Sequence, residues 1–388
     1  MDLTPLVTEL SRGFTNFSWG NLVMILAGVV LIYLAIAKEY EPNLLIPIGV
    51  GCILANIGMA VAMDAQGSVT CGLDQNFLTI LYCARIKSEL FPLLIFVGVG
   101  AMIDFTPLLA MPQMVMLGAA GQFGIYATLI FATFLGFNLS QSASIGVIGA
   151  IDGPTAIFVA TKLAPELLGA IAVAAYSYMS LIPVIQPPIM KLLTTRKERL
   201  IRMDYSPRPV SRRALIAFPI IVTIIISLLA PQAAPLIATL MLGNFLRVAG
   251  VVERLNKSVQ NELINMSTLF LGLCVGATMT AARFLNWQTA GVLALGLIAF
   301  IIDTVAGLLF GKLIALISRG KINPLIGACG ISAFPMAARL SAKTALDEDF
   351  DNFILMHAMG SNTAGQLGSV VAGGLLLVLA TSFLPLIH

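Results

Sequence analysis

The sequence predicts an all-α membrane protein that crosses the bilayer many times. Of its 388 residues, 58% are hydrophobic and only 11% are charged, whereas soluble domains carry about 25% charged residues. Apolar stretches of about 20 residues recur along the chain, the length at which a helix spans the hydrocarbon core. The alternating ten-residue segments typical of an outer-membrane barrel do not occur in the sequence.

The apolar stretches predict about ten to twelve membrane elements. They comprise residues 20–37, 43–63, 90–104, 113–137, 142–162, 167–190, 214–229, 231–249, 264–283, 288–317, 324–342 and 352–386. The last stretch is too long for one crossing, and its glycines predict a break near Gly360–Gly368.

A basic segment divides the chain into two membrane halves, residues 1–190 and 214–388. Its charges are Lys191, Arg196, Lys197, Arg199, Arg202, Arg208, Arg212 and Arg213. Cytoplasmic loops are enriched in Lys and Arg, so we place residues 191–213 inside the cell as a linker. Nucleic-acid binding is a poor explanation of this charge in a short loop between membrane segments.

An internal repeat relates the two halves. Residues 145–156 align without gaps on residues 326–337, and an isoleucine, two glycines, a proline and an alanine coincide. Inverted halves whose Gly- and Pro-broken helices meet at the membrane midplane are typical of secondary transporters. The alternative is that apolar segments rich in Gly and Pro resemble one another without a common origin.

Asp152 is the strongest candidate for an ion-binding residue. It lies between apolar residues, next to Gly153 and Pro154, which disfavour a continuous helix. An ionised group in the hydrocarbon core costs about 2.5–3.5 kcal/mol on insertion scales, so this carboxylate needs a cation or a proton. The alternative is an ordinary helix cap before Pro154; a cap inside the membrane is the less favoured explanation.

The second half places neutral oxygen donors at the equivalent break. Asn323 and Ser332 flank Gly327, whose carbonyl the break could free, and Asn362 follows in a Gly-bounded segment. Such hard oxygen ligands suit an alkali cation. Tyr178 aligns with Asn362 and offers a phenol as ligand or proton donor, although membrane tyrosines are also common interfacial anchors.

Arg339 is a full positive charge within a segment that the pattern predicts to be apolar. It could neutralise Asp152 in an ion pair, or it could bind an anionic substrate through its planar guanidinium. Asp104 and Asp303 are expected nearer to segment ends, as caps or interface residues. The five cysteines form no CxxC pair and are expected to be free buried thiols.

The motifs resemble the β subunit of sodium-pumping, biotin-dependent decarboxylases that act on oxaloacetate, methylmalonyl-CoA or glutaconyl-CoA. The similar motifs are residues 96–102, 152–158, 163–179, 185–190, 250–254, 323–327, 335–339 and 357–360. Residues 64–88 look shorter than in oxaloacetate-type members, so the resemblance does not decide the parent substrate.

The resemblance implies an enzyme subunit that decarboxylates carboxybiotin and couples this reaction to outward Na+ movement with proton uptake. It implies that Asp152, Asn323, Asn362, Ser332 and Gly327 form the Na+ site. Ser332 and Tyr178 would assist the ion or proton steps, and Arg339 would face the carboxybiotin carboxylate.

The resemblance also implies partners and a location. Biotin would be attached to a separate carrier and carboxyltransferase subunit, because this chain lacks a Met-Lys-Met attachment sequence. A small membrane subunit would complete an oligomeric complex in the bacterial inner membrane, surrounded by lipid. The alternative function is a Na+- or H+-coupled secondary transporter of a small organic anion.

Overall fold

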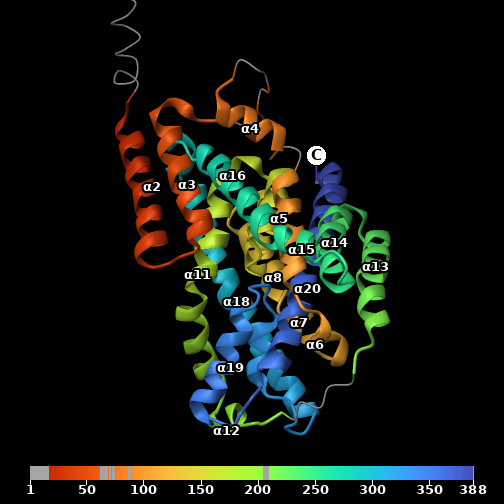
Figure 1. Cartoon of the computed structure of the whole chain (residues 1–388). Coiled ribbons are helices and arrows are strands. Elements are labelled where there is room, and N and C mark those ends of the chain that lie inside the picture. Colours follow the sequence, from red (N-terminus) through yellow and green to blue (C-terminus); the bar gives the residue numbers. More distant parts are fainter. Residues whose placement is uncertain are drawn as a thin grey trace, which may run out of the picture.

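The structure is a computed structural model. It describes residues 17–61, 69, 71, 75–85, 89–203 and 209–387. Within these residues the regular structure is helical, as predicted (Figure 1). Residue His388 and parts of residues 64–88 lie outside the described residues.

Eight helices of the described chain are long and apolar enough to cross a membrane. They are α2 (Trp19–Ala37), α3 with its π-helical end η1 (Pro42–Met59), α7 and α8 (Met114–Phe134), η3 and α11 (Pro165–Leu193), α13 (Arg212–Leu229), η4 and α14 (Pro231–Ala249), α18 (Trp287–Ile317) and the part Leu355–Ser382 of α20 (Leu355–Ile387). α7 and α8 are the separate helices Met114–Ala120 and Phe123–Phe134. The protein is therefore a multi-pass membrane protein.

Four further predicted segments are helical but shorter or interrupted. Two are α5 (Leu90–Met102) and α16 (Ile264–Ala277). The third runs through α9 (Leu139–Gly146), the 3-10 turn η2 (Val147–Ala150) and α10 (Gly153–Leu163). The fourth consists of the 3-10 helix η6 (Pro324–Gly330) and α19 (Met336–Glu348). The expected ten to twelve elements count these four together with the eight long helices.

Short elements complete the described chain. They are α4 (Phe77–Arg85), α6 (Thr106–Ala110), α12 (Arg196–Arg199), α15 (Glu253–Ser258), η5 (Val259–Leu263) and α17 (Ala281–Phe284).

The predicted break near Gly360–Gly368 is wrong, because α20 is one helix of 33 residues (Leu355–Ile387). Its glycines allow close packing instead of interrupting the helix. A Cβ atom on Gly365 would overlap the carbonyl of Gly330, at the end of η6. At about 1.5 Å per residue the helix is roughly 50 Å long. It therefore exceeds the hydrocarbon core of about 30 Å and must tilt or project from it.

Helices from the two predicted halves pack on each other reciprocally. α3 lies against α16, and α5 lies against α14. The side-chain amide of Asn56 donates to the carbonyl of Met279, just beyond α16, at 2.8 Å. The amide of Asn244 in α14 donates to the carbonyl of Ile103, just beyond α5, at 3.0 Å. This exchange favours the repeat, which stays a prediction.

Two cysteines were predicted wrongly as free thiols. Cys71 and Cys83 form a disulfide whose Cα atoms are 5.8 Å apart, within the range that the bond requires. The pairing depends on how α4 folds back on the preceding chain, which residue spacing does not reveal. Cys52, Cys274 and Cys329 are free and buried, as expected. α4 lies at the end of the molecule opposite to α12 (Figure 1).

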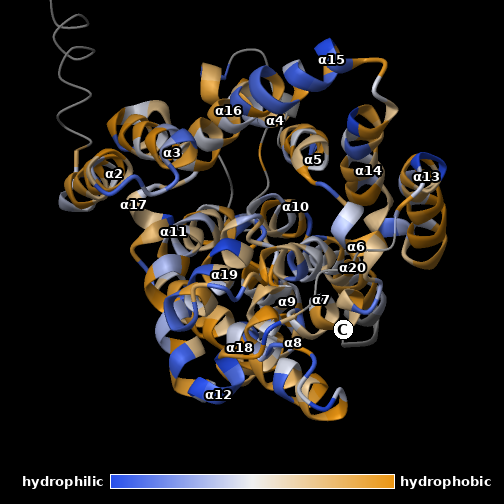
Figure 2. Ribbon diagram, turned by 60° about the horizontal axis from the view of Figure 1, so that its bottom comes forward, coloured by the Kyte–Doolittle hydropathy of each residue, from blue (hydrophilic) through white to orange (hydrophobic). Residues whose placement is uncertain are grey.

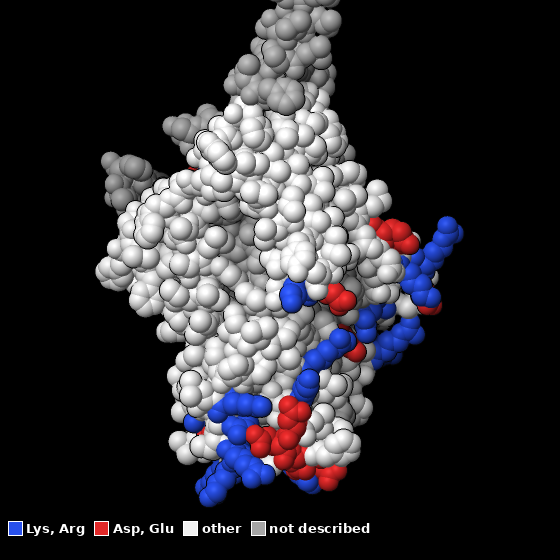
Figure 3. All heavy atoms as spheres, turned by 90° about the vertical axis from the view of Figure 1, so that its left-hand side faces the viewer, with Lys and Arg blue, Asp and Glu red and all other residues white. Residues whose placement is uncertain are grey.

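Charged side chains gather toward the end of the molecule that contains α12 and α19 (Figure 3). The outer helix α13 is mostly hydrophobic after its two N-terminal arginines, whereas α12 is hydrophilic (Figure 2). The basic linker is folded against acidic residues. Arg199 pairs with Glu348 at 2.8 Å and Arg202 pairs with Asp349 at 2.7 Å. The linker is thus attached to the end of α19.

Candidate ion-binding site

The two broken segments touch each other at their breaks. After η2, Ile151 adopts a left-handed conformation with a φ of 53°, and Asp152 is the extended residue before α10. The amide of Ser332 donates to the carbonyl of Ala150 at 3.1 Å. The segments that the sequence alignment pairs, residues 145–156 and 326–337, therefore meet in space.

Asp152 is buried at this junction, with 5% of its surface exposed. Its Oδ2 atom accepts hydrogen bonds from Thr155 Oγ1 at 2.6 Å, Ser369 Oγ at 2.8 Å and Gln366 Nε2 at 3.0 Å. Gln366 and Ser369 belong to α20, so they are no part of a local helix cap. Although Asp152 stands at the N-cap position of α10, two of the three donors around its carboxylate come from another helix.

Arg339 does not supply the counter-charge. Its side chain is exposed on α19, and no ion pair joins it to Asp152 in the described part of the chain. The expectation of an apolar segment around Arg339 is wrong, because α19 also carries Lys343, Asp347 and Glu348. The ion-pair alternative is thereby excluded, and a role in binding an anion stays a prediction.

Asn362 lies on the same face of α20 as Gln366 and Ser369, because residues four and seven positions apart share a helix face. It is fully buried. Its amide nitrogen donates to the carbonyls of Cys329 at 3.2 Å and Ile331 at 2.7 Å, whereas its Oδ1 atom has no partner. A buried oxygen without a donor is costly and invites an explanation such as a ligand. The expected break around Asn362 is absent from this helix.

Two glutamines that the sequence reasoning missed act on the same break. The carbonyls of residues 328–331 each accept a bond from a buried carboxamide. Gln186 donates to the first at 2.7 Å, Asn362 to the second and fourth, and Gln122 to the third at 3.0 Å. We call Gln122, Gln186 and Asn362 the carboxamide collar. All three side-chain oxygens lack a partner. The available signal was a glutamine in the interior of each of two apolar segments, residues 113–137 and 167–190.

Ser332 and Gly327 hold the second broken segment in place. Ser332 is buried and donates through its hydroxyl to the carbonyl of Gly365 at 3.0 Å. A Cβ atom on Gly327 would overlap the carbonyl of Gly307 in α18, so this position requires glycine for packing. Their roles as Na+ ligands stay predictions.

Asn323 lies at the other end of η6, beside the linker. Its oxygen accepts from the amide of Leu325 at 3.0 Å, and its nitrogen donates to the carbonyls of Arg199 at 3.0 Å and Ile201 at 2.9 Å. Seven residues of 3-10 helix, at about 2 Å each, place it roughly 14 Å from the break. The structure does not bring Asn323 to Asp152, and its role as a ligand stays a prediction.

Two tyrosines of α11 occupy different positions. Tyr178 donates its hydroxyl to the carbonyl of Leu293, and its ring lies against Gly296 of α18. The ring of Tyr176 covers Gly153, where a Cβ atom would overlap it. Tyr176, which the sequence reasoning missed, is therefore the tyrosine beside the residue that follows Asp152. The function of Tyr178 stays a prediction.

Asp104 and Asp303, which were both expected near segment ends, lie in different places. Asp104 lies just before α6, whose N-cap is Phe105. It accepts from the amide of Thr106 at 2.9 Å and pairs with Arg247 at 3.6 Å, so its expected place near a segment end is confirmed. Asp303 was expected near a segment end, and this is wrong. It lies in the middle of α18 and is fully buried.

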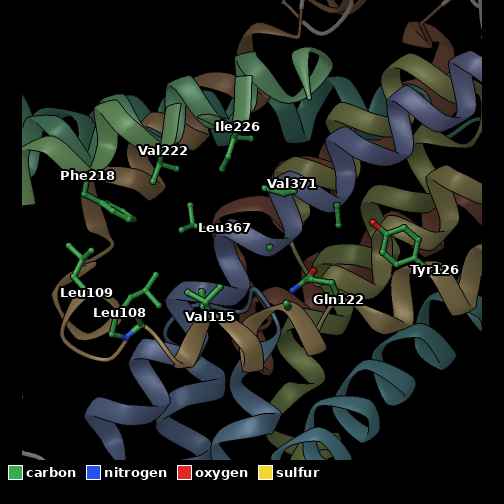
Figure 4. Close-up of a pocket in the computed structure, with 15 residues that line it drawn as sticks. Leu108, Leu109, Val115, Gln122, Tyr126, Phe218, Val222, Ile226, Leu367 and Val371 are labelled. Carbon is green, nitrogen blue, oxygen red and sulfur yellow. The ribbon is translucent and has the colours of Figure 1, made fainter. Parts of the chain in front are cut away.

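A cavity of about 590 Å³ borders the collar. Apolar side chains of α6, α7, α13 and α20 line it, including Leu108, Val222 and Leu367, and Gln122 reaches it from one side (Figure 4). Its lining contains no charged side chain, so the cavity does not suit a charged substrate. In the described residues no cluster of His, Cys, Asp and Glu could hold a transition metal.

Comparisons with known proteins identify the family of the chain. Residues 20–380 match the family described as the Na+-transporting oxaloacetate decarboxylase beta subunit. The methylmalonyl-CoA decarboxylase subunit beta of Veillonella parvula is 52% identical over 370 residues, covering 95% of this chain and 96% of the relative. The glutaconyl-CoA decarboxylase subunit beta of Acidaminococcus fermentans is 50% identical over 377 residues, covering 97% of each.

The oxaloacetate decarboxylase beta chain of Klebsiella pneumoniae is 48% identical over 417 residues, covering 94% of this chain and 96% of the relative. This alignment is longer than the 388-residue chain, so it contains gaps in this chain. The three identities are too similar to select one parent substrate. The chain belongs to the family of the Na+-transporting oxaloacetate decarboxylase beta subunit, the membrane subunit of Na+-transporting decarboxylases.

Proposed function

We propose that Na+ binds at the junction of the two breaks, between Asp152 and Asn362, and that carboxybiotin decarboxylation drives its outward movement. The observation that carries this proposal is a buried carboxylate with three side-chain donors and no ion-pair partner among the described residues. A bound Na+ would make the site formally neutral, which lowers the cost of its burial. The free oxygen of Asn362, on the same face of α20, supports a second ligand position.

Arg339 would hold the carboxylate of carboxybiotin. Two features support this role: its guanidinium is exposed, and it lies in the first turn of α19, where helix N–H groups attract anions. Carboxybiotin supplies the labile bond between nitrogen and the carboxyl carbon. The chain's own contribution would be to orient that carboxylate beside the broken segment.

The complex would contain a biotin carrier and carboxyltransferase subunit, a small membrane subunit and more than one copy of some component. We place it in the bacterial inner membrane with residues 191–213 in the cytoplasm, because the positive charge of the linker favours that side. The disulfide of Cys71 and Cys83, at the opposite end, favours an oxidising exterior for α4.

Substitution of Asp152 tests the ion site. In proteoliposomes containing the whole complex, Asp152→Asn should lower Na+-dependent decarboxylation at least about 100-fold, because a neutral amide cannot balance the cation. Uptake of ²²Na+ should fall in parallel, while membrane insertion stays normal. Asp104→Asn is the matched control and should retain activity. Unchanged Na+ stimulation in Asp152→Asn would show that the site is assigned wrongly.

Co-purification tests the dependence on a partner. The decarboxylase function predicts that avidin captures this chain together with a biotinylated subunit, and that Na+ transport requires decarboxylation. Gradient-driven uptake of an organic anion by the isolated chain would instead support a secondary transporter.

A further inference from the structure

A second carboxylate is buried in the continuous helix α18, which packs against both broken segments. Among the described residues, Asp152 and Asp303 are the only buried acidic side chains. Asp303 is 0% exposed and lies near the centre of the 31-residue helix α18. The proposed Na+ site does not use it, so its charge needs a separate explanation.

The carboxylate of Asp303 lies in a narrow slot between α8 and η2. Its Oδ1 atom accepts from the amide of Gly124, in the first turn of α8, where the helix N-terminus favours negative charge. Its Oδ2 atom has no partner. A Cβ atom on Gly149 would lie 3.1 Å from Oδ2, and one on Gly124 would lie 2.6 Å from Oδ1. Glycine on both walls leaves room for the carboxylate and brings it to the segment that ends at Asp152.

Among the described residues, no ion pair balances the carboxylate of Asp303. The titratable groups on the elements packed against α18 are Tyr126, Tyr176, Tyr178, Lys191 and Cys329. Lys191 is exposed, and on α18 itself Lys312 is engaged with Glu198 at 3.3 Å. An unbalanced carboxylate within the membrane is costly, so Asp303 requires a proton or a bound cation.

The surroundings of Asp303 suit a proton better than a metal cation, unlike those of Asp152. Hydroxyl and amide donors from two helices surround Asp152, whereas Asp303 receives one backbone donor in the described part of the chain. A Cβ atom built on Gly149 would meet both Oδ2 and the methyl group of Ala299 at 3.1 Å, and Oδ2 has no hydrogen-bond partner among the described residues. Two acids in contrasting environments can divide two ionic tasks between them.

We propose that Asp303 is the proton-binding carboxyl group that exchanges its proton against the Na+ bound at Asp152. Proton uptake forms one O–H bond at Oδ2, release breaks it and returns H+, and no other bond changes. Both sites are then neutral when Asp303 is protonated and Asp152 holds Na+. This inference rests on the proposed function and adds the group that handles the proton.

The test is Asp303→Asn in proteoliposomes of the whole complex. Asparagine preserves the shape and can accept from Gly124, but it cannot exchange a proton. We expect decarboxylation turnover to fall about 10²-fold or more, as for loss of a proton-transfer group, and its pH dependence to flatten. Half-saturation by Na+ should stay within about twofold, since the ligands at Asp152 remain. Wild-type turnover with an unchanged pH profile would overturn the proposal.

Two further variants separate this role from a structural one. Thr304→Val removes a buried hydroxyl without a partner on the adjacent residue and should retain turnover. If Asp303→Asn does not assemble, Gly149→Ala presses a methyl group toward Oδ2 and should shift the pH profile without changing Na+ half-saturation. A pH profile identical to wild type in Gly149→Ala would then overturn the proposal.

The outcome at Asp152 keeps the two hypotheses apart. Persistence of Na+ stimulation in Asp152→Asn contradicts the proposed ion site, whatever Asp303 does. Loss of activity in Asp152→Asn together with normal turnover in Asp303→Asn contradicts only the proton role.

Discussion

The individual polar residues around the breaks have different roles. Asp152 supplies charge, and Asn362 supplies a free neutral oxygen while its nitrogen ties two carbonyls of the second broken segment. Gln122 and Gln186 tie the two other carbonyls without adding charge. The carboxamide collar therefore fixes backbone groups that would otherwise lack hydrogen bonds in hydrocarbon.

Asn362→Ala should raise the Na+ concentration for half-maximal decarboxylation about tenfold or more. The substitution removes a proposed ligand and leaves two buried carbonyls without a donor, at about 1–3 kcal/mol for each unsatisfied group. The measurement is Na+ titration of the reconstituted complex.

Thr363→Val is the control for Asn362→Ala, because it also removes a buried polar atom without a partner from α20. Its Na+ dependence should match wild type. An equal shift in both variants would indicate general damage to the helix, and no shift in Asn362→Ala would exclude it as a ligand.

Single site residues could be predicted from the sequence wherever one polar residue lies within an apolar stretch. Asp152 and Asn362 could be predicted for that reason, and the structure brings both to one face of α20. Gln186 carried the same signal, but its meaning depends on a carbonyl 142 positions away. The exposure of Arg339 was also beyond local reasoning, because it depends on which surface α19 leaves uncovered.

The elements depend on glycines that admit close neighbours. The contact of α20 with η6 occurs at Gly365 and Gly330, and the contact of η6 with α18 occurs at Gly327 and Gly307. Close backbone approach through small residues is the usual way in which membrane helices associate. The broken segment is thus clamped between two intact helices.

Gly365→Ala should destabilise the protein far more than Gly360→Ala. The first methyl group would overlap backbone atoms of Gly330, whereas the second would lie 3.3 Å from its nearest neighbours. We expect a loss of about 1–3 kcal/mol for Gly365→Ala, as for an overpacked core. The midpoint of thermal unfolding in detergent measures the difference, and equal midpoints would contradict this packing.

The length of the apolar stretches was enough to predict the helices. Gly and Pro near polar residues were enough to predict the breaks at residues 145–156 and 326–337. The false break in α20 has the same local signature. A glycine that interrupts a helix and a glycine that admits a neighbour look alike until the neighbour is known. The Cys71–Cys83 pairing likewise needed the path of the chain around α4.

At the scale of the whole molecule, the linker is attached to the second half at one end. Arg202 contacts Asp349 through two nitrogen–oxygen pairs at 2.7 and 2.9 Å, and the amides of Asn323 and Asn352 hold the carbonyl of Arg199 at 3.0 and 2.9 Å. Ion pairs and neutral hydrogen bonds therefore both attach residues 199–202 of the linker to the second half.

Attachment of the linker should weaken in acid. The hydrogen bonds from Arg202 lower the pKa of Asp349 below its ordinary value of 3.8. A carboxyl group with a lowered pKa contributes fully above the ordinary value and loses its contribution as the pH falls through the lowered one. Hydrogen exchange of residues 196–203 should therefore increase below about pH 4.

Arg202→Ala provides the comparison, since it removes the cation that lowers the pKa of Asp349. Exchange in this variant should already be faster at neutral pH and should change less on acidification. Identical exchange in the two proteins at all pH values would contradict the role of this pair.

The sidedness of the molecule can be read from its cysteines. After reduction in intact cells, a membrane-impermeant maleimide added outside should modify Cys71, which is exposed. Without reduction it should not, because the disulfide blocks the thiol. Cys329 is buried and serves as the internal control. Modification only from the cytoplasmic side of inverted vesicles would reverse the proposed orientation.

The continuity of α20 has a consequence for which changes in chain length the protein can tolerate. Asn362 stands four residues before Gln366 and seven before Ser369, so one extra residue between them would turn Asn362 by about 100° away from the other two. Insertions and deletions should therefore accumulate outside residues 362–369, even where single substitutions within that stretch are accepted. In this helix the spacing of the side chains constrains the sequence as strongly as their identity.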